Sequence, residues 1–143
     1  MQRGVTLIEI AICLVIAGIL SSAAIPAVTS FRDRYTVQSV ALVIAGAHNR
    51  ARIRAVLEGQ NTELEVRADS VILRVGNGPT AHPVWSAPGP TASGTSMTSP
   101  PRVLTFAPSG VTVGFANATF VVTRGSARRQ VVVSRLGRVR VIP

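Results

Sequence analysis

Residues 5–27 form one apolar segment that reads VTLIEIAICLVIAGILSSAAIPA. As an α-helix, its twenty-three residues would extend about 34 Å, enough to cross a hydrocarbon core about 30 Å thick. The segment therefore predicts a transmembrane helix. The preceding residues 1–4, Met-Gln-Arg-Gly, carry a positive charge, which orients this end of the chain toward the cytoplasm and the remainder toward the other side.

Glu9 distinguishes this segment from an ordinary signal peptide or a plain anchor. A secretory signal has an uncharged apolar centre, and cleavage after Ser22-Ala23-Ala24 would suit its small-residue rule. A carboxylate in the middle of a bilayer costs about 2.5–3.5 kcal/mol, and less near the surface. We therefore expect Glu9 to have a partner; the simpler alternative is a glutamate tolerated at the membrane interface.

The residues around Glu9 resemble the N-terminal signal of type IV pilins and type II secretion pseudopilins. Gly4-Val5-Thr6-Leu7-Ile8-Glu9 follows the family pattern of glycine, usually phenylalanine, then Thr-Leu-Ile-Glu, with Val5 in place of the phenylalanine. The resemblance implies that a prepilin peptidase cuts between Gly4 and Val5 and methylates the new terminus of Val5. It also implies that Glu9 pairs with a neighbouring subunit's terminal amine during assembly, and that Pro26 is the family's helix-kinking proline.

The helical pattern continues beyond the membrane segment through residues 28–60, with Gly59 as the predicted C-cap. Apolar residues recur near every 3.6 positions on one face, and a second apolar set lies on another side. This pattern predicts packing against a head on one side and against neighbouring subunits on the other. The first face contains Val37, Val40, Ile44, Ala47, Ala51 and Ala55, and the second contains Leu42, Ile53 and Leu57.

From residue 62 the apolar period changes to two, which is typical of strands separated by tight turns. The sequence predicts an α+β fold, in which a long N-terminal transmembrane and filament helix packs on a small antiparallel two-sheet head over residues 61–143. Residues 76–101, with four Gly and six Pro, are predicted to form a loop. The predicted strands are Thr62–Arg67, Val71–Val75, Arg102–Phe106, Val111–Phe115, Thr119–Arg124, Gln130–Ser134 and Arg138–Ile142.

Charge and a lone aromatic residue leave alternatives open. All fifteen basic residues are arginine and six residues are acidic, and the resulting charge of +9 attracts nucleic acid, anionic lipid or acidic protein. A high-GC genome would account for arginine over lysine, but not for the excess. Arg50, Arg52 and Arg54 are interpreted as complementing the helix dipole rather than binding a ligand. Trp85 is either an interface anchor or a side chain packed on the head's own surface.

The second half of the head resembles the GspH/FimT group, which contains pseudopilin H of type II secretion and the FimT minor pilins. The similar stretches are Phe106–Gly110, Arg128–Ser134 and Gly137–Val141. The resemblance implies a subunit of a pseudopilus or type IV pilus, near its tip, that supports filament assembly and protein secretion.

A second hypothesis is DNA binding during uptake. In the FimT branch a C-terminal Gly-Arg-x-Arg motif is associated with this activity, and Gly137-Arg138-Val139-Arg140 fits it. Alternation along a strand directs both guanidinium groups to one face, where they would contact phosphates in a salt-sensitive manner. The alternative is that these arginines protect a strand edge from aggregation. The candidate DNA-binding residues are Arg128, Arg129, Arg135, Arg138 and Arg140.

No catalytic, metal or cofactor site is predicted. Cys13 is the single cysteine, and His48 and His82 have no spacing typical of metal ligands. No nucleophile, base and acid can be assembled, and no phosphate-binding loop is present in the sequence. We therefore expect a structural and binding protein, not an enzyme. Its expected location is the bacterial inner membrane, crossed once with the head in the periplasm, and then a filament.

Overall fold

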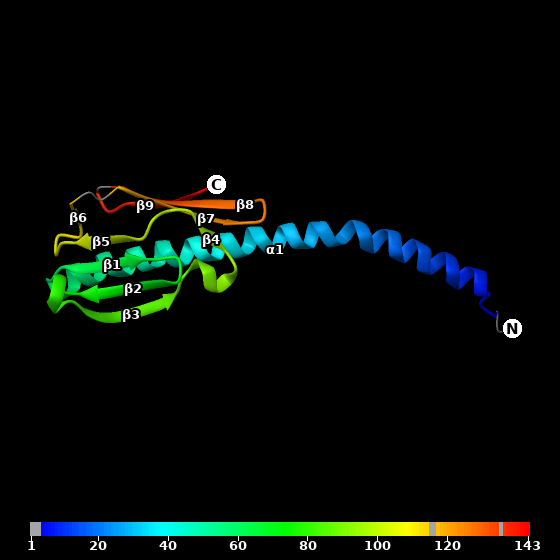
Figure 1. Ribbon diagram of the computed structural model, residues 1–143, viewed down its shortest axis with the longest axis horizontal. Helices are drawn as coiled ribbons and strands as arrows, with labels where there is room; N and C mark the ends of the chain where they lie inside the picture. Colours follow the sequence, from blue (N-terminus) through cyan, green and yellow to red (C-terminus); the bar gives the residue numbers. More distant parts are fainter. Residues whose placement is uncertain (1–3, 115–116, 135) are drawn as a thin grey trace. The chain divides into compact units, whose positions relative to one another are not determined.

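The computed structural model describes residues 4–114, 117–134 and 136–143. Helix α1 spans Leu7–Glu58, and short strands and two 3₁₀ helices follow it (Figure 1). The chain divides into two compact units, Met1–Arg32 and Asp33–Pro143, so α1 contributes residues to both.

The first unit contains the N-terminal part of α1, whose apolar side chains are unburied. The large apolar residues from Leu7 to Val28 that the structure describes are 51% to 87% exposed. An 18-residue window of α1 has a mean hydropathy of 2.4, so this described helix is long and apolar enough to cross a membrane. Removing so much apolar surface from water requires lipid or other protein chains.

The second unit packs the last part of α1 against two antiparallel sheets, which confirms the predicted α+β architecture (Figure 1). The strand orders are β3-β2-β1-β5-β6 and β4-β7-β8-β9. The strands of the first sheet are β1 Thr62–Val66, β2 Ser70–Val75, β3 His82–Pro88, β5 Arg102–Phe106 and β6 Thr112–Val113. Those of the second are β4 Ser96–Met97, β7 Ala118–Arg124, β8 Ala127–Val133 and β9 Val139–Ile142.

One core joins the helix to both sheets. The six residues of the first predicted apolar face of α1 are all buried, whereas Leu42, Ile53 and Leu57 are more than half exposed. Small alanines on the buried face allow the strands to approach the helix closely, and the Thr62 hydroxyl donates to the Ala51 carbonyl at 2.8 Å. The sheets contribute inward-facing residues at period two, among them Leu64, Val66, Leu73, Leu104, Phe106, Phe120, Val122, Val131 and Val133.

The prediction of a loop over residues 76–101 is wrong. This segment contains β3, β4 and the 3₁₀ helices Gly78–Thr80 and Pro90–Ser93. Proline is tolerated in β3 because, among the described strands, β3 pairs only with β2 and forms the edge of its sheet, where a missing N–H breaks few hydrogen bonds. The Gly89 N–H donates to the Asp69 carbonyl at 2.8 Å, which holds the segment against the turn between β1 and β2.

Two other strands differ from their predicted bounds by more than one residue. Strand β8 begins at Ala127, because the tight turn at Gly125-Ser126 lets Arg124 pair directly with Ala127. Strand β6 is reduced to two residues, and the predicted end at Phe115 lies outside the described residues.

Candidate functional site

The first candidate site is the start of α1, where Thr6 caps the helix. Thr6 precedes Leu7, and its hydroxyl and carbonyl oxygens accept from the Glu9 N–H at 3.3 and 3.1 Å. These bonds satisfy a backbone donor that a helix terminus otherwise leaves free. Sequence reasoning missed this role of Thr6, although a threonine three residues before a glutamate is a capping signal.

Glu9 lies in the first turn of α1, and its side chain is exposed among exposed leucine and isoleucine residues. A carboxylate there complements the positive end of the helix dipole. In lipid or in a helix bundle, the same carboxylate would attract a cation strongly because little water remains to screen it. The site therefore combines an apolar packing surface with one acidic group.

Pro26 lies inside α1 and has no N–H, so the Ser22 carbonyl lacks its usual helical donor. Nearby hydroxyl groups bond to the helix backbone, with Ser22 donating to Ile19 at 2.8 Å and Thr29 to Pro26 at 2.9 Å. The helix continues on both sides of Pro26, as the helical pattern of the sequence predicts.

The second candidate site is the outer face of the second sheet at its free edge. In the described part of the chain β9 pairs only with β8, and Arg140 lies opposite Val132. Val139 and Val141 pack against the core, so alternation places Arg138 and Arg140 on the outer face, where both are exposed. Neither arginine forms an ion pair with a carboxylate that the structure describes.

Gly137 fixes the turn that leads into this edge. Its φ is +74°, a conformation that favours glycine, and its N–H donates to the Ser134 carbonyl at 2.9 Å. A Cβ at this position would lie 3.1 Å from the Gly110 carbonyl oxygen. The glycine of the Gly-Arg-x-Arg segment is thus required by the turn, which places the arginines on the outer face.

The other three candidate DNA-binding residues differ from one another. Arg128 is exposed and shares the outer face, about 13 Å along β8 from the residue opposite Arg140. The structure does not bring Arg129 to this face, because its Nε donates to Gln38 Oε1 of α1 at 2.8 Å. Arg135 lies outside the described residues.

The interpretation of Arg50, Arg52 and Arg54 as partners of the helix dipole is wrong, because the last turn of α1 contains no basic residue. Arg54 forms an ion pair with Glu58, and the Arg50 guanidinium lies 4.9 Å from the centre of the Trp85 ring. Trp85 packs against the core, as in the second of its two predicted roles, and because it is only half-buried, part of its side chain stays accessible.

The side-chain carboxylates of the second unit are all engaged. Glu65 is buried and contacts two arginines. The hydrogen bond from Arg74 at 2.6 Å, supported by Arg67, outweighs the opposing effect of burial and lowers the pKa of the Glu65 carboxyl. The other four have partners as follows: Asp33 pairs with Arg124 at 2.8 Å, Glu58 with Arg54, Glu63 accepts from the Gly78 N–H at 3.2 Å, and Asp69 from the Ser70 hydroxyl at 3.0 Å.

His48 is a fully buried polar residue on the core face of α1. Its ring meets Phe106 edge to face at 4.9 Å, and neither ring nitrogen has a hydrogen-bond partner among the described residues. Burial lowers the pKa of His48, and the Arg52 charge acts in the same direction. The Asn49 side chain acts against this lowering of the pKa, although no hydrogen bond of ordinary geometry joins it to either ring nitrogen of His48. His48 is therefore neutral in the folded head near neutral pH.

The free energy of unfolding is expected to fall as the pH drops below about 6.5. The unfolded chain binds a proton at His48 there while the folded chain does not, which costs up to about 1.4 kcal/mol per pH unit. Denaturant unfolding of the full chain in detergent, measured from pH 8 to 5.5, checks this. His48→Leu should remove most of the slope, and exposed His82→Gln should leave it; equal slopes in all three proteins would refute the assignment.

No metal centre is indicated among the described residues, since no group of three His, Cys, Asp or Glu side chains comes together there. The two histidines lie apart, one in the core and one exposed on β3. The arrangement supports packing, pairing and anion contact.

Comparison with known proteins agrees with these features. Two crystal forms of the Pseudomonas aeruginosa (strain PAO1) type IV minor pilin FimU are similar in fold. One has a TM-score of 0.57 at 21% identity, covering 74% of this chain and 92% of that chain. The other has a TM-score of 0.60 at 20% identity, covering 77% and 90%. No curated protein matches the chain significantly.

Two family matches cover most of the sequence. Residues 1–25 match the prokaryotic N-terminal methylation motif, and residues 41–137 match the family described as Type II transport protein GspH. The exposed apolar helix and the motif are consistent with anchoring in the inner membrane before filament assembly. The chain therefore belongs to the GspH family, whose members are prepilin-like structural proteins and not enzymes.

Proposed function

We propose that this chain is a minor subunit of a type II secretion pseudopilus or a type IV pilus. Prepilin peptidase would cut it between Gly4 and Val5 and methylate Val5. The subunit then leaves the inner membrane, with its head in the periplasm, and enters a filament near the tip. There it supports filament assembly and protein secretion.

The start of α1 carries the proposal. A methylation motif over residues 1–25 includes the capped start of α1, where the apolar side chains are unburied and Glu9 is the only acidic residue before Asp33. This part of the helix is stabilised by lipid or by other apolar helices. A carboxylate near its start can pair with the amine that cleavage creates on a neighbour, which would also fix the stagger between subunits.

Filament entry is tested by producing the chain with the other subunits of its own system, with and without prepilin peptidase. We expect the protein in the sheared filament fraction only when the peptidase is present. Equal recovery in both strains, or recovery in the membrane fraction alone, would contradict the proposal.

DNA capture is a second candidate function. The observation that favours it is the outer face of the second sheet, where Arg128, Arg138 and Arg140 are exposed without carboxylate partners among the described residues. Guanidinium groups arranged in this way would contact phosphates independently of sequence. The face contains no aromatic residue among those described, so stacking on bases would not contribute.

Arg138→Gln combined with Arg140→Gln is expected to weaken binding of double-stranded DNA at least about tenfold. Losing two phosphate contacts should also make the slope of log affinity against log salt less negative by about 1.8. Fluorescence polarisation on the full chain in detergent measures both quantities. The matched control is Arg50→Gln with Arg102→Gln, which removes equal charge elsewhere. An equal loss of DNA affinity in both double variants would show that the effect comes from net charge and not from this face of the sheet.

A further inference from the structure

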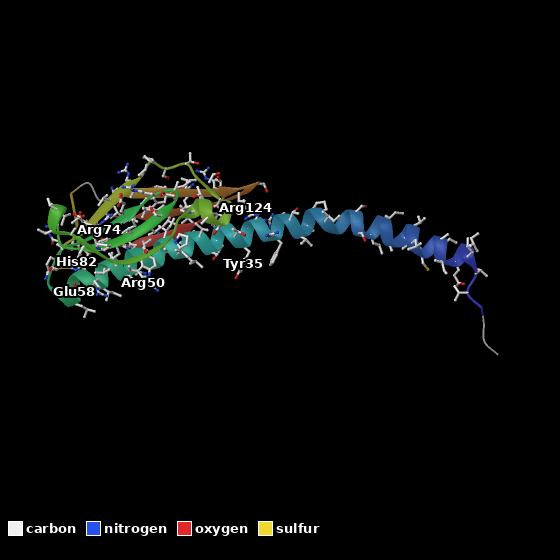
Figure 2. The ribbon with its side chains drawn as sticks, turned by 60° about the horizontal axis from the view of Figure 1, so that its bottom comes forward. Tyr35, Arg50, Glu58, Arg74, His82 and Arg124 are labelled. Carbon is white, nitrogen blue, oxygen red and sulfur yellow. The ribbon has the colours of Figure 1, made fainter. Side chains whose placement is uncertain are left out.

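A groove of about 350 Å³ opens between the end of α1 and strands β2 and β3. Figure 2 shows Arg50 on this part of α1, between Tyr35 and Glu58. Ile53 and Leu57 of the helix are 57% and 77% exposed beside the groove. Its lining consists of Arg50, Ile53, Arg54, Leu57, Leu73, Val84 and Trp85.

An irregularity in the β2–β3 pairing shapes one wall of the groove. Leu73 pairs with Trp85 and Arg74 with Pro83, so Val84 is an extra residue in β3. A bulge of this kind re-aims side chains, and Val84 and Trp85 both pack toward the core and α1. The bulge therefore places two neighbouring apolar side chains on the same wall, opposite exposed apolar residues of the helix.

The groove is positively charged. Arg54 is neutralised by Glu58, whereas Arg50 lies over the Trp85 ring and forms no ion pair with a described carboxylate. Tryptophan and arginine are the residue types that most often dominate binding energy at interfaces. An apolar floor with one unneutralised guanidinium fits a segment that presents a large apolar side chain next to a carboxylate.

A second copy of this chain is a poor source of such a segment. Three of the five side-chain carboxylates of its second unit are paired with arginines, and the other two, Glu63 and Asp69, lie on β1 and on the turn after it. The charge of +9 also opposes association of two copies. The complementary partner is therefore a different and more acidic protein.

We propose that this groove, which we call the Trp85 groove, is the docking site for an acidic and apolar segment of a different prepilin-type subunit in the same filament. This inference rests on the proposed function. It adds the place and the chemistry of one contact between subunits, in which Trp85, Ile53 and Leu57 enclose the apolar side chain and Arg50 binds the carboxylate.

Site-specific photo-cross-linking tests the proposal in cells that make the full chain. A photoreactive residue replaces Leu57, and each other prepilin-type subunit of the system carries an epitope tag. We expect an adduct with one tagged subunit, with a yield that falls at least tenfold in Arg50→Gln and in Trp85→Ala. Arg102→Gln, an equal charge change at an exposed position of β5, should leave the yield within twofold.

Several outcomes would overturn the proposal. They are an adduct only with a second copy, no adduct with any tagged subunit, or equal yields in Arg50→Gln and Arg102→Gln. Arg50 is exposed, so its replacement tests the groove even where Trp85→Ala disturbs folding. A chain that enters filaments without the adduct contradicts the groove alone, whereas absence of the natural chain from filaments contradicts the proposed function.

Discussion

The Glu9→Gln variant is expected to be cut and methylated like the natural chain, yet to be depleted at least tenfold from filaments. The substitution keeps the size of the side chain and removes the charge that would pair with a neighbour's amine in surroundings of low dielectric. Immunoblots of sheared filaments, with mass spectrometry of the N-terminus, separate the effect on assembly from any effect on processing.

The control for this variant is Cys13→Ser. Cys13 is exposed and lies one helical turn beyond Glu9, and the substitution replaces its sulfur by oxygen without changing the charge. Cys13→Ser should reach filaments at the natural level. If Glu9→Gln does so too, the carboxylate has no role in assembly, and Glu9 is only a glutamate tolerated at the interface.

Phe106→Ala is expected to lower the free energy of unfolding by about 3–5 kcal/mol. Phe106 is fully buried on β5 and touches His48 of α1, so its removal leaves a cavity between the sheet and the helix. Denaturant titration of the full chain in detergent measures the change, with fluorescence of Trp85, the single tryptophan, as the reporter. For a domain of ordinary stability, this loss is a large part of the total.

Phe31→Ala provides the matched control, because Phe31 is 71% exposed. Its replacement should change the free energy of unfolding by less than about 0.5 kcal/mol. A similar small change for Phe106→Ala would show that the head does not depend on the core between α1 and β5.

Periodicity was sufficient to predict the helix and most strands. The positions from Val37 to Ala55 repeat at helical spacing, and each one buries the side chain that the pattern indicated. Strand β5 begins and ends where its alternation predicted, at Arg102 and Phe106. These elements are predictable because one apolar face decides which way each of them turns.

Features that depend on tertiary contacts were not predictable. The prolines of β3 led to the prediction of a loop, because the sequence does not show that this strand lies at the edge of its sheet. Arg129 looks like its neighbour Arg128, and because the strand was predicted to begin only at Gln130, alternation did not show that Arg129 turns toward Gln38 of α1. The Trp85 groove arises from a bulge, which is visible only once β2 and β3 are paired.

The most direct test of the account is the mass of the N-terminal peptide of the mature protein, isolated from cells with an active prepilin peptidase. Assignment as a prepilin-type subunit predicts a chain that begins at N-methylated Val5. A chain that keeps Met1, or one that begins at Ile25 after cleavage behind Ser22-Ala23-Ala24, would contradict it.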